Sequence, residues 1–222
     1  MPQVFDRPEA VPDPSQPRCP FLLLIDTSGS MHGAIDEVNE GLKTFARLVK
    51  EDTLARQRIW VGVQTFGGSP QRHGDFVPAL QFTPPTLTSA GGTPMGSALL
   101  DGLDWLRAKR REYRAAGSGL YTPIVILLTD GAPTDTNTDV WRQASDRLLE
   151  DESERKVVLF KLGVGSADFD FLKSLGRRAP LRITEGDIRE TFVWLSDLGK
   201  SRSASNPDDA LVPPQVPFGS PI

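Results

Sequence analysis

"LLLIDTSGSM", residues 22–31, is the stretch that decides the fold, because an aliphatic run ends there in an acid and several small polar residues. A run that is apolar on both faces is typical of a strand covered by helices on both sides of a parallel sheet. Asp26 ends the run, and Ser28 and Ser30 follow it at alternate positions. The stretch therefore predicts a buried central strand that leads into a polar turn.

Other aliphatic runs complete the sheet that this strand predicts. "IVILLTDG" at 124–131 and "VVLFKLGVG" at 157–165 have the same character, and "RIWVGVQTF" at 58–66 is similar. "DFVPALQF" at 75–82 carries Pro78 in its middle. Because proline cannot donate a ladder hydrogen bond, we expect this run at an edge of the sheet, antiparallel to its neighbour.

Between the strands, the apolar period changes to that of a helix. We expect helices at about 34–50, 96–113, 138–150, 168–176 and 187–199, and a short last strand at 181–184. The last helix should open with a capping box of Asp187 and Glu190. Strands that alternate with helices predict an α/β domain with a doubly wound, mostly parallel central sheet, one antiparallel edge strand and helices on both faces.

The 222 residues suffice for one substantial domain, which we place at residues 18–200. Residues 1–17 are Pro-rich and predict a flexible N-terminal arm, and residues 201–222 predict a flexible Pro- and Ser-rich tail. We expect removal of residues 204–222 to leave the melting temperature almost unchanged.

Composition limits the partners and the location. A net charge of −4 argues against nucleic acid as a partner. Cys19 is the only cysteine, so neither an intramolecular disulfide nor a thiolate metal site can form. The sequence begins with no signal-peptide pattern, and no apolar run approaches the roughly 18 residues that span a bilayer. We expect a soluble cytoplasmic protein that binds no membrane.

Although the net charge is negative, the chain contains one basic cluster, "RAKRREYR" at 107–114. It falls where a helix is expected to end, and cations are favourable at a helix C-terminus. The cluster is therefore interpreted as a solvated helix end, with a docking patch as the alternative.

Three polar segments should meet at one edge of the sheet, because ligand sites in such folds lie at the carboxyl ends of the strands. Two of them contain Asp26 and Asp130, and the third, "SAGGTPMGSAL" at 89–99, contains Thr93 beside a Gly pair. Carboxylates and hydroxyls form an all-oxygen set that suits a hard divalent cation. We expect Mg²⁺, with Mn²⁺ or Ca²⁺ as alternatives, bound by Asp26, Ser28, Ser30, Thr93 and Asp130.

The motifs "DTSGSM", "GGTPMG" and "LLTDGAPTD" resemble those of von Willebrand factor A domains with a metal-ion-dependent adhesion site, over about residues 20–198. The resemblance implies a Rossmann-like fold and a non-catalytic protein-binding module. It also implies that Ser28, Ser30 and Thr93 contact the metal. Asp26 and Asp130 would hold it directly or through water, and an Asp or Glu of a protein partner would complete the coordination.

The same motifs are similar to those of TerY-like bacterial members of tellurite-resistance and stress gene clusters. This narrower resemblance implies a scaffold or switch that works with a Ser/Thr protein kinase and a metal-dependent phosphatase. The alternative within the binding class is a partner of an AAA+ ATPase of the MoxR or chelatase kind. We expect exposed residues around the metal to form the partner rim, namely Met31, His32, Gly92, Pro94 and Thr134.

Enzyme classes fit the sequence less well, and we expect no catalytic residue. A phosphotransferase with an aspartyl nucleophile at Asp26 would need a second acid two residues later, where Ser28 stands. A serine hydrolase would need a glycine before the nucleophile and a nearby base, and only His32 is close. The chain contains no GxxxxGK[ST] sequence, which argues against a nucleotide cofactor.

Overall fold

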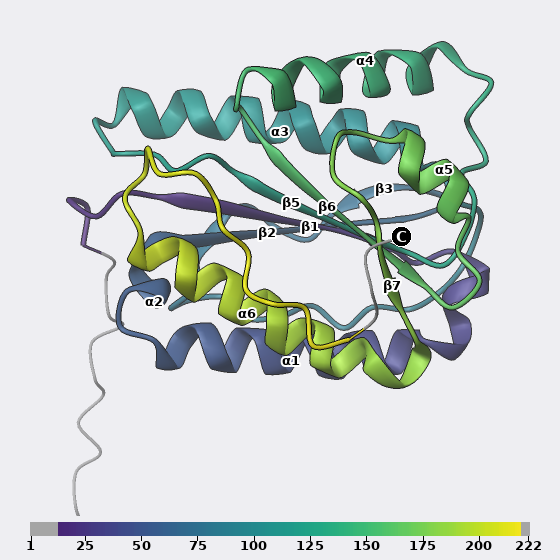
Figure 1. Ribbon diagram of the computed structural model, residues 1–222, viewed down its shortest axis with the longest axis horizontal. Coiled ribbons are helices and arrows are strands. Elements are labelled where there is room, and N and C mark those ends of the chain that lie inside the picture. Colours follow the sequence, from purple (N-terminus) through teal and green to yellow (C-terminus); the bar gives the residue numbers. More distant parts are fainter. Residues whose placement is uncertain (1–12, 219–222) are drawn as a thin grey trace, which may run out of the picture.

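The aliphatic runs form the centre of a seven-stranded sheet in the computed structural model, which describes residues 13–218 (Figure 1). The strand order is β3-β2-β1-β5-β6-β7, and β1, β2, β5, β6 and β7 pair in parallel. The fold class predicted from the sequence is confirmed. The parallel strands are β1 (Cys19–Asp26), β2 (Ile59–Gly67), β5 (Ile124–Thr129), β6 (Val158–Val164) and β7 (Leu181–Ile183).

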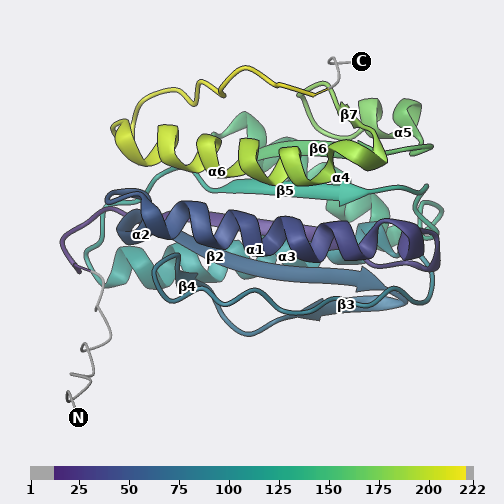
Figure 2. The same cartoon turned by 90° about the horizontal axis from the view of Figure 1, so that it is seen from below.

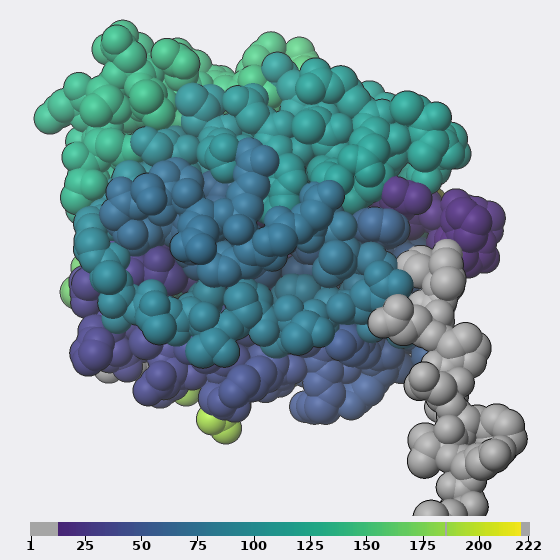
Figure 3. Space-filling model, turned by 180° about the vertical axis from the view of Figure 1, so that it is seen from behind, coloured from purple at the N-terminus to yellow at the C-terminus, as the bar shows by residue number. Residues whose placement is uncertain are grey.

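The edge of the sheet beyond β2 is built differently from the expected single strand. β3 (Ser69–Arg72) and β4 (Val77–Pro78) both pair antiparallel with β2. The strand expected at 75–82 is reduced to two residues, consistent with the lost hydrogen-bond donor at Pro78. The segment between β2 and α3 covers this edge between the two helical layers, as Figure 3 shows.

The helices pack in two layers on opposite faces of the sheet (Figures 1 and 2). The layer on one face comprises α1 (Ile35–Glu51), α2 (Ala55–Arg58) and α6 (Ile188–Ala204). The other layer comprises α3 (Met95–Ala115), α4 (Asp139–Ser153) and α5 (Phe169–Ser174). Two 3₁₀ turns, η1 (Gly29–Gly33) and η2 (Glu185–Asp187), precede α1 and α6.

Side chains of β1 alternate between the two helical layers. Phe21 and Leu23 pack in the core that includes α1 and α6, whereas Leu22 and Leu24 pack in the core that includes α3. This alternation follows from the period of two residues in a strand. Because both faces are covered, every residue of β1 is buried, as the uninterrupted apolar run predicted.

Close approach of α1 and α6 depends on one glycine. A Cβ atom at Gly41 of α1 would lie 2.1 Å from Cδ2 of Phe192 on α6, far inside van der Waals contact. Gly41 therefore leaves the space that the Phe192 ring occupies.

The capping box predicted for α6 is wrong. The Asp187 side chain makes no hydrogen bond to the start of the helix, and instead its Oδ2 accepts one from Thr184 Oγ1 at 2.6 Å. The short 3₁₀ turn before α6 takes Asp187 out of the extended conformation that a capping residue needs, with φ −100° and ψ 0°.

Residues 205–218, which we expected to belong to a flexible tail, lie along α6 (Figure 2). Trp194 Nε1 donates a hydrogen bond to the Pro214 carbonyl at 3.1 Å, and Phe218 is only 3% exposed. The buried Arg202 donates to the carbonyls of Pro207 and Asp209 at 2.8 and 2.9 Å. We therefore revise the expectation that removing this segment leaves the melting temperature unchanged. Residues 1–12 of the predicted N-terminal arm and 219–222 of the tail lie outside the described residues.

Within residues 13–218, none of the helices combines the length and the apolar character that crossing a membrane requires.

Candidate functional site

The predicted site lies where the order of the strands reverses. From β1 the chain continues to β2 on one side and later returns to β5 on the other side. The β1–β5 register pairs Ile25 with Leu128, so that Asp26 lies level with Thr129 and one residue from Asp130. Ligand sites in doubly wound sheets lie at the carboxyl ends of strands at such a reversal.

Asp26 lies at the buried bottom of the candidate site. Its side chain is fully buried, and it accepts hydrogen bonds from the Ser28 backbone N–H at 2.8 Å and from Thr129 Oγ1 at 2.6 Å. Burial raises the pKa of the Asp26 carboxyl, and the charge of Asp130 adds to this, whereas the hydrogen bonds from Thr129 and Ser28 lower it. The net shift is upward, so the site disfavours the negative charge that Asp26 carries at neutral pH.

Hydroxyl groups connect the bottom of the site to the surface. Ser28 Oγ lies 3.0 Å from Ser30 Oγ, and Ser30 Oγ donates a hydrogen bond to Asp130 Oδ1 at 2.7 Å. Ser28 is 2% exposed, Asp130 is half-buried and Ser30 is exposed. The first and second predicted segments therefore meet through their side-chain oxygens.

The third segment is tied to the other two by backbone hydrogen bonds. The Gly29 N–H donates to the Gly91 carbonyl at 2.9 Å, and the Thr134 N–H donates to the Thr93 carbonyl at 2.9 Å. A Cβ atom at Gly131 would lie 3.7 Å from Thr93 Oγ1 and 3.8 Å from Ser30 Oγ. The hydroxyls of Thr93 and Ser30 thus flank one point beside Gly131, and the structure brings all five predicted ligands to one edge.

Two residues that sequence reasoning missed hold this arrangement. Asp135 accepts hydrogen bonds from the backbone N–H groups of Gly96 and Ser97 at 3.0 and 2.9 Å, which fixes the start of α3 next to Thr93. Thr129 fixes the Asp26 carboxylate. Both stand in "LLTDGAPTD", where the threonine before Asp130 and the second acid were the available signals.

The donor set fits a divalent cation of octahedral geometry. Neighbouring ligands of Mg²⁺ at about 2.1 Å lie about 3.0 Å apart along an edge of the octahedron. The distances of 3.0 Å from Ser28 Oγ to Ser30 Oγ and 2.7 Å from Ser30 Oγ to Asp130 Oδ1 are close to this value. In residues 13–218 no group of three or more His, Cys, Asp or Glu side chains is placed to hold a metal. A cation here would therefore depend on the hydroxyls as well as on the two carboxylates.

The residues expected to form the partner rim do not all reach the surface. His32, Gly92 and Thr134 are exposed and Pro94 is half-buried. Met31 is fully buried and packs in the core that includes α1 and α6, so its assignment to the rim is wrong. The 3₁₀ turn η1 directs its side chain inward, which the short motif alone did not indicate.

Within residues 13–218, no histidine is placed next to the serine hydroxyls. His32 Nδ1 lies 3.4 Å from Ser89 Oγ, and among the described side chains it makes no hydrogen bond to Ser28 or Ser30. A Ser–His pair of the kind that activates a serine nucleophile is therefore not seen among the described residues.

Comparison with protein families matches residues 22–186 to the von Willebrand factor type A domain. No curated protein matches the chain.

Solved structures share the fold at low identity. The ArnB paralog VWA2 of Sulfolobus acidocaldarius is 20% identical with a TM-score of 0.55, and the match covers 81% of this chain and 45% of that one. The pilus adhesin SpaC of Lactobacillus rhamnosus GG is 16% identical with a TM-score of 0.61, and the match covers 83% and 31%. The manganese-loaded TRAP protein of Plasmodium vivax is 18% identical with a TM-score of 0.50, and the match covers 82% and 74%. This chain spans less than half of the first two.

Proposed function

Because the chain belongs to the von Willebrand factor type A domain family, we propose that it is a non-catalytic module that binds a protein partner through a divalent cation. The cation would be held by Asp26, Ser28, Ser30, Thr93 and Asp130. Bound there, it would supply a positive charge with an open coordination position for an Asp or Glu of the partner.

The observation that carries this proposal is the convergence of Ser28 Oγ, Ser30 Oγ and Asp130 Oδ1 in one run of side-chain oxygens, an all-oxygen set of the kind that suits a hard cation. The raised pKa of Asp26 also supports the proposal, because burial without a neighbouring cation disfavours the ionised form of this carboxyl group. A bound cation would remove this penalty.

Roles of the individual residues follow from their exposure. Asp26 orients the Ser28 backbone and supplies charge from the bottom of the site. Ser30 and Asp130 are accessible and would face the partner's carboxylate. His32 and Thr134, both exposed, would form part of the rim that contacts the partner.

Mg²⁺ is the cation that we propose, because hydroxyl and carboxylate oxygens suit a hard ion that also keeps bound water. The manganese-loaded state of the Plasmodium vivax TRAP protein supports a divalent ion in a related fold. For the cellular role, we propose a scaffold in a bacterial stress response with a kinase and a phosphatase, which is supported only by the loop motifs.

Calorimetric titration with MgCl₂ and MnCl₂ tests the site. Asp130→Asn should weaken binding at least tenfold, since it removes a charge next to the cation. Asp139→Asn is the matched control: it removes a carboxylate that is 80% exposed and paired with Arg142 at the start of α4, and it should leave the affinity within twofold of wild type. Equal losses in both variants would contradict the assignment.

Capture from a lysate then tests the function. The wild-type protein should retain a partner in Mg²⁺ and release it in EDTA, and Asp130→Asn should retain none in either buffer. Partners that bind equally with and without the metal would contradict metal-dependent binding, and hydrolysis of phosphate or ester substrates that depends on Asp26 or Ser28 would contradict the non-catalytic assignment.

A further inference from the structure

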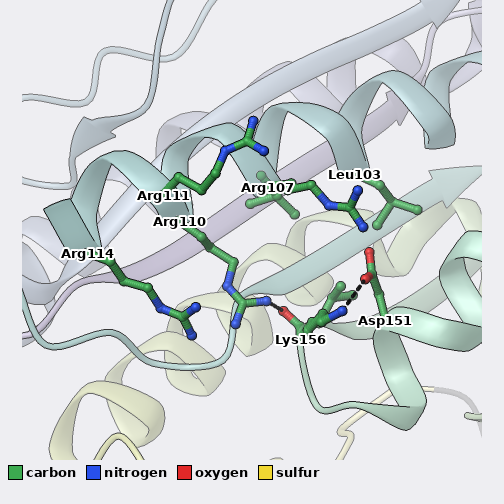
Figure 4. Close-up of a pocket in the computed structure, with 9 residues that line it drawn as sticks. Leu103, Arg107, Arg110, Arg111, Arg114, Asp151 and Lys156 are labelled. Atoms are coloured by element: carbon green, nitrogen blue, oxygen red, sulfur yellow. Dashed lines mark hydrogen bonds and ion pairs between the residues drawn. The ribbon is translucent and has the colours of Figure 1, made fainter.

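A small pocket lies against α3 near the amino-terminal end of β6, at the opposite end of the strands from the candidate metal site. It has a volume of about 120 Å³, and Leu103, Leu106 and Val157 form its apolar part. Figure 4 shows Arg107, Arg110 and Arg114 reaching from α3 toward the side where Asp151 and Lys156 lie. α3 begins at Met95, next to the candidate metal site, and Arg110 is 15 residues further along the helix. At a rise of 1.5 Å per residue, the pocket therefore lies about 20 Å from the metal site.

The arginines share one face of the helix because of their spacing. Arg107, Arg110, Arg111 and Arg114 follow the i, i+3, i+4, i+7 pattern, and like charges at this spacing repel one another. None of the four forms an ion pair within residues 13–218. A solvated helix end explains exposed arginines, but it does not explain why they line a pocket.

Arg110 is held in place at the pocket wall. Its Nη1 donates a hydrogen bond to the Lys156 carbonyl at 2.7 Å, while its buried Nε has no partner among the described residues. Burial and then the charge of Arg114 lower the pKa of the Arg110 guanidinium, while the charge of Asp151 partly opposes them. An anion in the pocket would offset both effects.

The one carboxylate in the pocket, Asp151, is shared between Arg147 and Lys156, and its Oδ1 has no hydrogen-bond partner among the described residues. Asp151 Oδ2 accepts a hydrogen bond from Arg147 Nε at 3.0 Å, and its Oδ1 lies 3.9 Å from Lys156 Nζ. Asp151 raises the pKa of Arg110 and so offsets part of its charge, but this single carboxylate, shared with Arg147 and Lys156, does not balance the three arginines Arg107, Arg110 and Arg114.

We propose that this pocket binds a phosphate monoester group. Several guanidinium groups around a small hollow suit a tetrahedral dianion, to which arginine can donate two parallel hydrogen bonds. The volume is well below the roughly 300–1,000 Å³ of pockets for drug-sized ligands. The net charge of −4 disfavours a long polyanion such as nucleic acid.

The source of the phosphate can be a phosphorylated side chain or a free phosphate. A second, larger hollow of about 630 Å³ shares Arg110, Arg114 and Val157 with this pocket. It offers space for a chain that continues beyond the phosphate, which favours a phosphorylated peptide.

Amide chemical shifts in a ¹⁵N-labelled protein test the proposal, with EDTA present so that phosphate cannot bind at a metal. The probes are inorganic phosphate, a five-residue phosphoserine peptide flanked by glycines, and the same peptide without phosphate. We expect saturable shifts at residues 103–114 and 151–158 with both phosphate probes and none with the third. Saturation by the phosphopeptide alone also supports the proposal and identifies a protein source.

Arg107→Gln and Arg114→Gln should each weaken phosphate binding about tenfold, through the loss of one charge-assisted hydrogen bond. Neither side chain donates a hydrogen bond within the described residues, so both variants should fold, which the melting temperature checks. The matched control is Arg47→Gln, which removes the same charge from an exposed ion pair on α1 and should change the affinity less than twofold.

Three results would overturn the proposal. The first is that neither inorganic phosphate nor the phosphopeptide gives saturable shifts. The second is equal weakening in Arg47→Gln. The third is tighter binding of a ten-residue oligothymidylate than of the phosphopeptide, with a steep salt dependence.

Discussion

At the residue scale, the buried carboxylate of Asp26 determines how the site responds to charge. Its raised pKa means that the ionised form destabilises the metal-free protein at every pH above that pKa, and that this effect disappears as the pH falls below the ordinary value of 3.8. The two hydrogen bonds from Ser28 and Thr129 reduce the penalty without removing it.

Asp26→Asn should therefore uncouple folding from metal binding. An amide oxygen can still accept the Ser28 N–H, so we expect the variant in EDTA at pH 7 to be more stable than wild type by about 1 kcal/mol. The difference should shrink as the pH falls through the pKa of Asp26. Mg²⁺ should no longer raise the melting temperature. Urea unfolding between pH 4 and 7 measures this, and a less stable variant in EDTA at pH 7 would contradict it.

Lys161 is a second buried charge, located on β6. It is 1% exposed, its ammonium group donates to the Leu175 carbonyl, and burial lowers its pKa from 10.5 to about 8. Since the folded state releases this proton more readily than the unfolded state, Lys161 should make stability rise with pH between about 8 and 10.5.

Lys161→Met should remove this rise. We expect the free energy of unfolding of wild type to increase by about 1–2 kcal/mol more than that of the variant between pH 7.5 and 10. Denaturant unfolding at several pH values provides the comparison. Parallel pH profiles for the two proteins would show that Lys161 is not a buried charge.

The sequence predicted which oxygens meet, but not every side-chain direction around them. Asp26, Ser28 and Asp130 could be placed because strand ends share one edge of a parallel sheet. Met31 could not, because the 3₁₀ turn that buries it has no signal in so short a motif. Metal binding by this set remains a prediction.

At the element scale, the start of α3 depends on a residue from another loop. Asp135 accepts hydrogen bonds from the N–H groups of Gly96 and Ser97 and from Ser97 Oγ, and the helix has no side-chain cap of its own. The position of Thr93 therefore depends on the loop after β5.

Asp135→Ala should weaken metal binding although Asp135 is not a proposed ligand. We expect a loss of about 1–2 kcal/mol in stability, as for other N-terminal caps, and a several-fold lower Mg²⁺ affinity. Asp139→Ala, four residues further on and exposed, is the control for both measurements. An unchanged Mg²⁺ affinity in Asp135→Ala would show that Thr93 is positioned by other contacts.

The segment after α6 contributes to the core through Phe218. Its ring packs edge-on against Trp194 at 6.0 Å between centroids. Phe218→Ala should destabilise the domain by about 2–3 kcal/mol, which corresponds to a lower melting temperature by about 5–10 °C. Deletion of residues 210–222 should have at least this effect, and thermal unfolding measures both. A shift below about 1 °C in both would restore the sequence-based expectation of a loose tail.

The elements that the sequence predicted well are those with a strong apolar pattern. The four central strands have continuous apolar runs and α1 has a helical apolar period, and their observed bounds lie within about three residues of the predicted ones. β3 contains only Ser69, Pro70, Gln71 and Arg72, and its strand conformation comes from pairing with β2 after the turn at Gly68, where φ is +85°. Tertiary pairing of this kind leaves no hydrophobic pattern to detect.

At the scale of the whole molecule, the candidate metal site and the arginine-lined pocket lie at opposite ends of the strands. The carboxyl ends of the strands gather two carboxylates and three hydroxyls, and the other end gathers arginines of α3 around a pocket. α3 connects the two ends, since it begins beside Thr93 and ends at Ala115 just after the arginines. The net charge of −4 does not reveal this separation of charge.

The most direct test of the central claim is anomalous diffraction from a crystal soaked in MnCl₂. We predict one strong manganese peak bounded by Ser28 Oγ, Ser30 Oγ and Thr93 Oγ1, with Asp26 and Asp130 beside it and distances of about 2.1–2.3 Å to the direct ligands. A saturating soak that leaves this edge without a peak, or that places the manganese elsewhere, would contradict the account.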